Sequence, residues 1–152
     1  MREPKILRDL AWQLSKVAQE TKPCHWISTP DGDQGDDWCP DCGNYKVRNL
    51  RRHDRRRRRE YILDGGWCTD HDSMPFCAGC GSILSGSLTS YGSAEELAYY
   101  LENGLSETPR VDAIYLAEIM EALVYIEIAD CDLSRITEMA RQTIAAAGGA
   151  NG

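Results

Sequence analysis

The chain has 152 residues, a formal net charge of −7 and 42% hydrophobic residues, with a single Phe. This length suits one domain with a hydrophobic core, or two small domains. The apolar stretches are short and interrupted by charges, which excludes a transmembrane helix, and no continuous apolar run of a secretory signal follows the first residues. We therefore expect a cytoplasmic protein that does not bind membranes.

An amphipathic helix is predicted over residues 4–20, where leucines recur at helical spacing. Residues 23–44 are rich in Pro, Gly and Asp and predict an acidic loop. The segment 45–63 has apolar ends around a run of arginines, and it fits either strand–loop–strand or a helix. Residues 64–92 are again rich in turn-forming residues, with a short strand predicted over 82–88.

Three helices are predicted in the C-terminal third of the chain. The first begins at Ser93, which opens a capping box, and ends at Gly104. The second begins at Pro109, and the third runs from Leu133 to Ala147. All three carry apolar residues at helical spacing, so we expect them to pack together.

Seven cysteines in a chain without a secretory signal favour metal binding over disulfide bonds. Four of them form two Cys-x-x-Cys pairs, each followed by Gly: Cys39, Cys42, Cys77 and Cys80. Such a turn directs two sulfurs to one edge of a zinc tetrahedron, and a following Gly allows the left-handed backbone. The sequence therefore predicts a structural Zn²⁺ site formed by these four residues.

The two pairs resemble the knuckles of a zinc ribbon, with the likeness covering residues 38–88. Their separation of 34 residues exceeds the usual 15–20 and leaves room for the arginine-rich segment as an insertion. The resemblance implies an α+β protein with a zinc-ribbon-like, β-rich middle. We expect four parts: an N-terminal helix (1–22), the zinc-binding module (23–92), a helical C-terminal part (93–147) and a disordered tail (148–152).

A second zinc site is an open alternative. Its ligands would come from two further Cys/His pairs, which are Cys24 with His25 and Cys68 with His71. In another arrangement, Cys68 and His71 share one ion with Cys77 and Cys80. Adjacent ligands such as Cys24 and His25 chelate one ion poorly, because neighbouring side chains diverge. The other interpretation is a buried Cys24 and two surface histidines, so the sequence predicts one zinc ion and allows two.

A catalytic alternative rests on the stretch between the cysteine pairs. Cys-x-x-Cys, then Asp70-His71-Asp72, then Cys-x-x-Cys is similar to the zinc-braced His-metal nucleases. That resemblance implies His71 as the base that activates water and Asp70 as a ligand of a divalent ion. The Asn that usually follows the second pair in that family is absent here. A solvated turn is the simpler interpretation, so we predict no enzyme activity.

Positive charge is concentrated between Tyr45 and Glu60, where nine basic residues stand against two acidic ones. The predicted contact residues are Arg51, Arg52, Arg55, Arg56, Arg57, Arg58 and Arg59. Guanidinium groups bind phosphates through paired hydrogen bonds, which suggests a nucleic acid backbone as partner. The alternatives are an acidic host protein or the acidic surface of the chain itself.

The stretch from Gly65 to Gly104 resembles a phage or prophage accessory protein of unknown role. The likeness rests on Phe76-Cys77-Ala78-Gly79-Cys80-Gly81 and on Leu88-Thr89-Ser90-Tyr91-Gly92 with the helix after it. It implies a mobile-element factor, with an anti-defence role and a protein–protein or nucleic acid contact. A third hypothesis is that acidic helices carrying Glu118 and Glu121 mimic nucleic acid charge. Our first prediction is a non-enzymatic, zinc-stabilised adaptor that contacts a host macromolecule.

Overall fold

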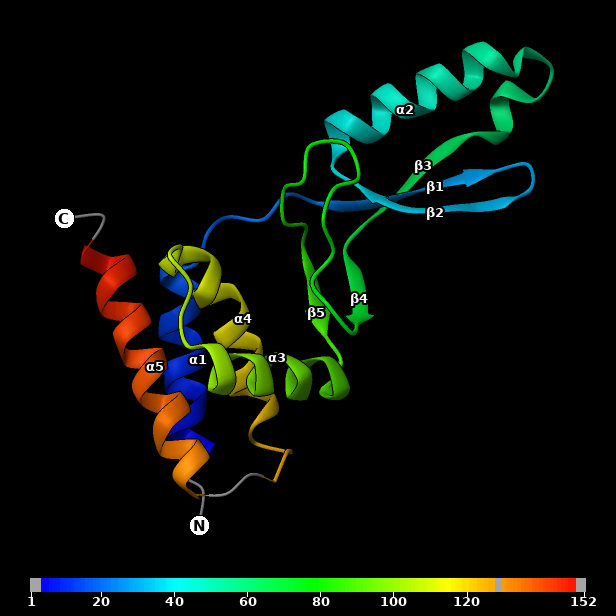
Figure 1. The fold of residues 1–152 in the computed structure, drawn as a ribbon. Helices are drawn as coiled ribbons and strands as arrows, with labels where there is room; N and C mark the ends of the chain where they lie inside the picture. The colour runs from blue at the N-terminus through cyan, green and yellow to red at the C-terminus, as the bar shows by residue number, and fades with distance from the viewer. Residues whose placement is uncertain (1–3, 128–129, 150–152) are drawn as a thin grey trace. The chain divides into compact units, whose positions relative to one another are not determined.

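The computed structural model describes residues 4–127 and 130–149 and shows an α+β protein that is 57% helical (Figure 1). The chain divides into two compact units. We call Thr21–Ser87 the cysteine unit, and we call the residues up to Glu20 together with those from Leu88 onward the helical unit. The predicted N-terminal segment is therefore no separate part, because its helix packs with the C-terminal helices. No helix within the described ranges is long and apolar enough to span a membrane.

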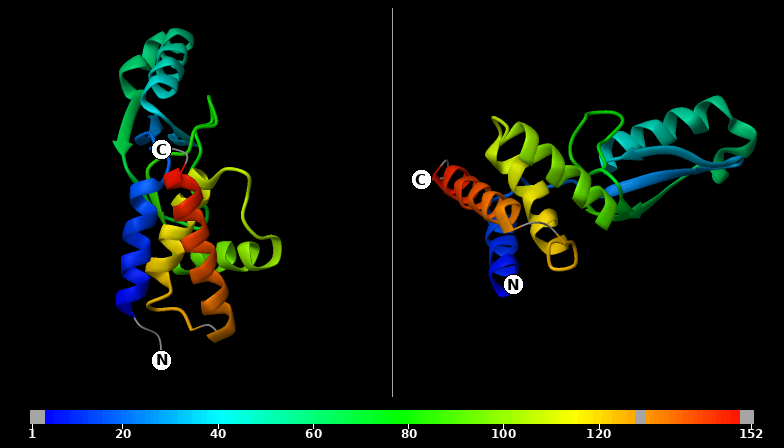
Figure 2. Two further views of the ribbon diagram at one scale, coloured as in Figure 1. Left: turned by 90° about the vertical axis from the view of Figure 1, so that its left-hand side faces the viewer. Right: turned by 60° about the horizontal axis from the view of Figure 1, so that its bottom comes forward.

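Four helices form the helical unit: α1 (Pro4–Val17), α3 (Ser90–Asn103), α4 (Pro109–Ala122) and α5 (Asp130–Gly149). Figure 2 shows α1, α4 and α5 side by side, and α4 contacts each of the other three helices. Leu14, Leu116 and Leu123 are fully buried. Burial of each such side chain contributes about 1.5–3 kcal/mol to the free energy of folding. The apolar periodicity predicted this core correctly.

Several helix ends differ from the predictions: α1 ends at Val17 instead of residue 20, and α5 begins at Asp130 instead of Leu133. Helix α3 begins at Ser90, and its N-cap is Thr89, whose hydroxyl accepts a hydrogen bond from Gly92 N at 2.9 Å. Ser93 is buried inside the first turns of α3, so the predicted capping box is wrong. Helix α5 continues to Gly149, so the first residues of the predicted tail are helical, and residues 150–152 lie outside the described ranges.

The cysteine unit contains a three-stranded antiparallel sheet in the order β2-β1-β3. Its strands are β1 (Cys24–Thr29), β2 (Gly32–Trp38) and β3 (Ile62–Gly66), with α2 (Pro40–His53) and the 3₁₀ helix η1 (Arg55–Glu60) between β2 and β3. A second pairing joins β4 (Cys68–His71) to β5 (Gly86–Leu88). Ile27, Trp38, Val47 and Leu84 are buried in the core of this unit.

The predicted loop over residues 23–44 is wrong, because most of it is the β1–β2 hairpin. Strand β2 has the sequence GDQGDDW, which is poor in strand-forming residues, and only its last residue, Trp38, is buried. Pairing with β1 gives this segment its backbone hydrogen bonds. At the hairpin turn the Thr29 hydroxyl donates to Gly32 O at 2.7 Å and accepts from Asp31 N at 3.2 Å.

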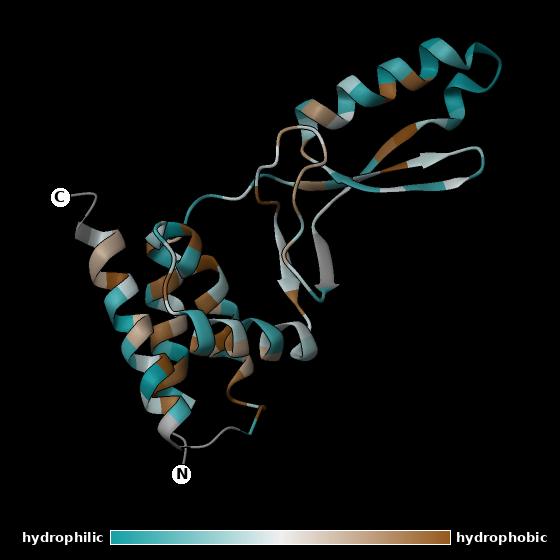
Figure 3. Ribbon diagram, viewed as in Figure 1, coloured by the Kyte–Doolittle hydropathy of each residue, from teal (hydrophilic) through white to brown (hydrophobic). Residues whose placement is uncertain are grey.

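The arginine-rich segment is helical, which settles the choice that the sequence left open. Helix α2 ends at His53, the chain turns at Asp54, and η1 follows. Figure 3 shows the end of α2 and η1 as the hydrophilic tip of the unit. The middle of the chain is therefore less β-rich than predicted, and the first cysteine pair lies at the start of a helix. The predicted strand over 82–88 is limited to Gly86–Leu88.

Candidate functional site

Four sulfur atoms come together in the cysteine unit. The Sγ atoms of Cys39, Cys42, Cys77 and Cys80 all lie within 4.8 Å of one another, and those of Cys39 and Cys80 are 3.9 Å apart. Four thiolates placed tetrahedrally about 2.3 Å from one ion would be about 3.8 Å apart. The two pairs predicted from the sequence are therefore brought together, and the four thiolates could hold a metal ion.

The first pair is positioned by the start of α2. Cys39 is the N-cap residue, with extended backbone (φ −73°, ψ 164°), and its sulfur accepts a hydrogen bond from Cys42 N at 3.4 Å. Pro40 occupies the first helical turn, where a backbone N–H would have no partner within the helix, so proline loses no hydrogen bond there. The helix start therefore fixes both sulfurs of this pair on one side of the metal position.

The second pair lies in a tight turn closed by a hydrogen bond from Gly81 N to Cys77 O at 2.9 Å. Gly81 has φ +76°, the left-handed conformation that glycine adopts without strain. The same expectation for Gly43 is wrong, because Gly43 is inside α2. A Cβ there would lie 2.5 Å from Leu63 Cδ1 and 3.1 Å from Trp38 Cβ, so close packing requires this glycine.

Backbone N–H groups point at the sulfur of Cys77. Those of Cys39 and Gly79 donate to it at 3.3 and 3.4 Å. Burial alone would raise the pKa of the Cys77 thiol, but these donors lower it on balance. Cys80 Sγ lies 3.2 Å from Ser82 Oγ, and hydrogen bonding with the hydroxyl and the backbone N–H of Ser82 lowers the pKa of Cys80 to about 6. The turn thus favours thiolates, which are the form that binds metals.

Two further residues adapt the site to four thiolates. Lys22 Nζ is 3.8 Å from Cys80 Sγ, and the charge on Cys80 raises the pKa of this lysine. A divalent ion with four thiolates keeps a charge of −2, which a nearby ammonium group offsets. At Gly79 a Cβ would lie 2.8 Å from Cys42 Cβ and 2.9 Å from Cys42 Sγ, so a larger residue would displace the ligand. Neither role was predicted from the sequence.

The described residues of the predicted second zinc site do not support it. Cys24 is fully buried and disulfide-bonded, so it offers no thiolate, and the expectation that the cysteines avoid disulfides is wrong for this residue. His25 Nδ1 lies 3.1 Å from Asp64 O. His71 belongs to β4 and is half-buried. The side chains of Cys68 and Asp70 lie outside the described part of the chain, so the second site and the catalytic role of His71 stay predictions.

A second candidate site lies at the tip formed by α2 and η1. Arginines line a cavity of about 660 Å³ there, which we call the arginine cavity: Arg48, Arg51, Arg52, Arg55, Arg58 and Arg59. Five of them were predicted contact residues, whereas Arg48 was missed, although it stands one helical turn before Arg51 and Arg52. Arg56 does not line the cavity.

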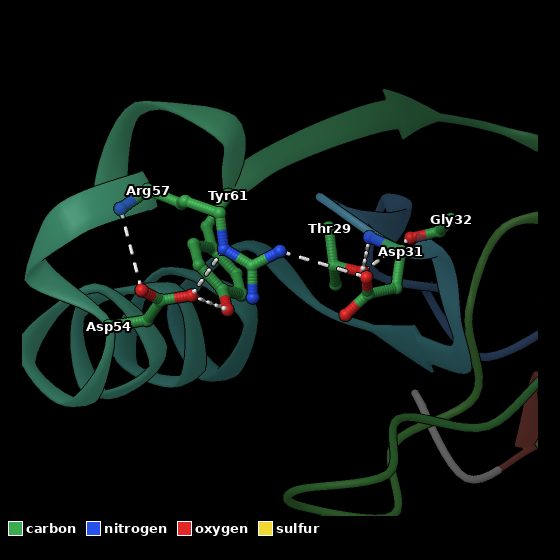
Figure 4. A network of polar contacts seen from close by, with 6 residues as sticks. All are labelled: Thr29, Asp31, Gly32, Asp54, Arg57 and Tyr61. Carbon is green, nitrogen blue, oxygen red and sulfur yellow. Dashed lines mark hydrogen bonds and ion pairs between the residues drawn. The ribbon is translucent and has the colours of Figure 1, made fainter.

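Arg57 forms ion pairs with two aspartates and does not line the cavity (Figure 4). Its Nε lies 3.2 Å from Asp54 Oδ2, and its Nη1 lies 3.7 Å from Asp31 Oδ1 at the β1–β2 turn. Asp54 also accepts hydrogen bonds from Tyr61 Oη at 2.8 Å and from Arg57 N at 3.4 Å. The Tyr61 hydroxyl is the main reason that the pKa of Asp54 is lowered. This network fixes the turn between α2 and η1.

Among Arg51, Arg52 and Arg55–Arg59, the predicted return to the chain's own acidic surface is seen at Arg57. Its ion pairs with described side chains are those with Asp31 and Asp54. Arg51 is held differently, because its Nε and Nη2 donate to the backbone oxygen of Tyr61 at 3.0 and 2.7 Å. That carbonyl fixes the guanidinium group without neutralising it, so the cavity keeps its positive charge.

The acidic surface predicted for charge mimicry is smaller than expected. Glu118 lies on α4 and accepts a hydrogen bond from Leu88 N at 3.4 Å, and burial raises the pKa of its carboxyl. Glu121 is exposed. The two carboxylates therefore do not form one solvent-facing pair.

Comparison with known proteins adds no relative. No protein-family model, no curated protein and no solved structure matches the chain. The fold and the site thus define a two-unit α+β protein with a four-cysteine candidate metal centre and a separate arginine cavity. The resemblances to zinc ribbons, His-metal nucleases and phage accessory proteins stay predictions.

Proposed function

We propose that this chain is a non-enzymatic binding protein, in which a structural zinc ion supports a surface that contacts the phosphate backbone of a nucleic acid. The observation that carries the proposal is the arginine cavity, which is lined by six exposed arginines that form no ion pair with the described acidic side chains. Guanidinium groups form paired hydrogen bonds with phosphate oxygens and remain charged at any physiological pH.

Zinc is the metal that this ligand set supports best. Four thiolates at tetrahedral spacing, closed to further ligands, are the pattern of structural zinc sites, and the alternative for such a set is iron. A closed site leaves no open position for a substrate, which agrees with a structural role. Elemental analysis separates zinc from iron directly.

Helix α2 connects the metal centre to the arginine cavity. Cys39 and Cys42 lie at its first turn, and Arg51 and Arg52 lie at its last, about 14–20 Å away along the helix. Binding a metal would tie the start of α2 to the Cys77–Cys80 turn, so the same ion would hold the helix that presents the arginines. Removal of the metal is therefore expected to weaken nucleic acid binding although every arginine is retained.

Fluorescence anisotropy with labelled 20-mers of DNA and RNA over a salt series tests the proposal. Removing one arginine that binds a phosphate should reduce the slope of log K against log salt by about 0.9, so Arg55→Ala/Arg58→Ala should reduce it by about 1.8. The matched control is Arg135→Ala/Arg141→Ala, which removes the same charge from exposed positions on α5. Equal slopes for both double variants would refute the proposed surface. Cleavage of plasmid with added Mg²⁺, absent in His71→Ala, would instead establish the nuclease alternative.

A further inference from the structure

The shape of the arginine cavity carries information beyond its charge. Arg48, Arg51 and Arg52 come from α2, and Arg55, Arg58 and Arg59 come from η1, which follows after the turn at Asp54. Arginines from two elements therefore line one open hollow at the tip of the unit. Its volume of about 660 Å³ corresponds to a sphere about 11 Å across, a size that holds a small ligand.

Two acidic groups at this tip, Asp54 and Asp31, are already engaged. Asp54 caps η1, accepts a hydrogen bond from Tyr61 Oη and forms an ion pair with Arg57 (Figure 4). Asp31, at the β1–β2 turn, forms a second ion pair with Arg57. Arg57 thus forms ion pairs with both carboxylates. Three other arginines of the run Arg55–Arg59 line the cavity. Arg51 is held in place by Tyr61 O. The cavity is positively charged and partly preorganised, so its occupant has to be an anion.

A regular nucleic acid backbone fills such a space poorly. One strand provides one charge per about 3.4 Å, so about three phosphate charges fit across the cavity. Each phosphate within the backbone is a diester with two free oxygens. A triphosphate chain carries about four charges over a shorter length, and its terminal group presents three acceptor oxygens. The arginines that line the cavity are therefore better satisfied by a compact polyphosphate.

We infer that the arginine cavity binds a compact polyphosphate group, of the kind carried by a nucleoside triphosphate or by the 5′ end of an RNA chain. The inference rests on the proposed function for the phosphate affinity of the cluster, and it adds the chemistry of the preferred ligand. The 5′-triphosphate would enter the cavity, and any attached nucleotides would continue outside it.

The first arm of the test uses two 20-mer RNAs of one sequence, with a 5′-triphosphate or a 5′-hydroxyl, in anisotropy titrations. We expect the triphosphate RNA to bind at least 10-fold more tightly. Arg55→Ala/Arg58→Ala should abolish that preference, and Arg135→Ala/Arg141→Ala should keep it. Arg55→Lys/Arg58→Lys, which keeps the charge and the fold but lacks the paired donors, should reduce it at least threefold.

The second arm uses inorganic tripolyphosphate, orthophosphate and ATP as competitors at equal ionic strength. Displacement of the RNA by tripolyphosphate at least 10-fold more effectively than by orthophosphate supports the inference, and equally effective ATP identifies the free nucleotide as a source. Equal affinities for both RNAs, with tripolyphosphate no better than orthophosphate, overturn it and leave the proposed function standing if binding depends on salt. Tripolyphosphate binding in a direct calorimetric titration, without any RNA binding in the anisotropy titrations, refutes the proposed function alone.

Discussion

Gly79→Ala tests whether the four sulfurs act as one metal site. The added methyl group would lie 2.8 Å from Cys42 Cβ and 2.9 Å from Cys42 Sγ, whereas ordinary contacts begin at 3.4 Å. One side has to move by about 0.5 Å, and metal–ligand distances tolerate only about 0.2 Å. We expect zinc affinity to fall about 10- to 100-fold, which corresponds to about 1.4–2.8 kcal/mol.

Competition with a chromophoric zinc chelator measures this decrease in purified protein. The matched control is Ala78→Ser, which adds one atom to an exposed side chain of the same turn and should leave the affinity within twofold of wild type. Circular dichroism of both variants in excess zinc checks that they fold. If Gly79→Ala bound zinc as tightly as Ala78→Ser, the packing of Gly79 against Cys42 would not constrain the site.

Three further predictions concern stability and binding. Tyr100→Phe removes the 2.9 Å hydrogen bond to the buried Asp112 carboxylate and should lower the free energy of unfolding in urea by about 1–3 kcal/mol; an unchanged value would contradict this. The pKa of Asp54 is lowered by Tyr61, so its stabilising effect is present above its unfolded pKa of 3.8 and is lost as the pH falls further. Asp54→Asn should therefore show a smaller drop in melting temperature between about pH 5 and pH 3 than wild type, and parallel curves would argue against the network. Tyr45 is 63% exposed on α2, and Tyr45→Ala should weaken binding of single strands about 5-fold or more but not of duplexes, whereas equal weakening would exclude base stacking.

The sequence predicted the features that depend on local periodicity and ligand chemistry. Leucines at helical spacing identified α1, and the Pro109 start of α4 followed from the tolerance of the first helical turn for proline. The two Cys-x-x-Cys pairs indicated their own convergence, because such turns are the ligand pattern of tetrahedral thiolate sites. These patterns are local in sequence, so they predict structure without information on how the rest of the chain folds.

The features that were missed depend on contacts between distant segments. Strand β2 forms because β1 offers a partner, although its own residues favour turns. The consecutive arginines look equivalent in sequence, yet Asp31 on a separate hairpin selects Arg57 from them. Gly43 was assigned a left-handed turn, but packing against Leu63, twenty residues later, is what requires it.

Metal content of the purified protein, measured by elemental analysis before and after chelation, tests the central claim most directly. We predict one zinc ion per chain in the wild-type protein and none in Cys77→Ser/Cys80→Ser. Removal of the ion from the wild-type protein should lower its melting temperature and weaken its binding to nucleic acid. Protein that contains no metal, and whose unfolding and binding do not change with chelator or added zinc, would contradict this claim.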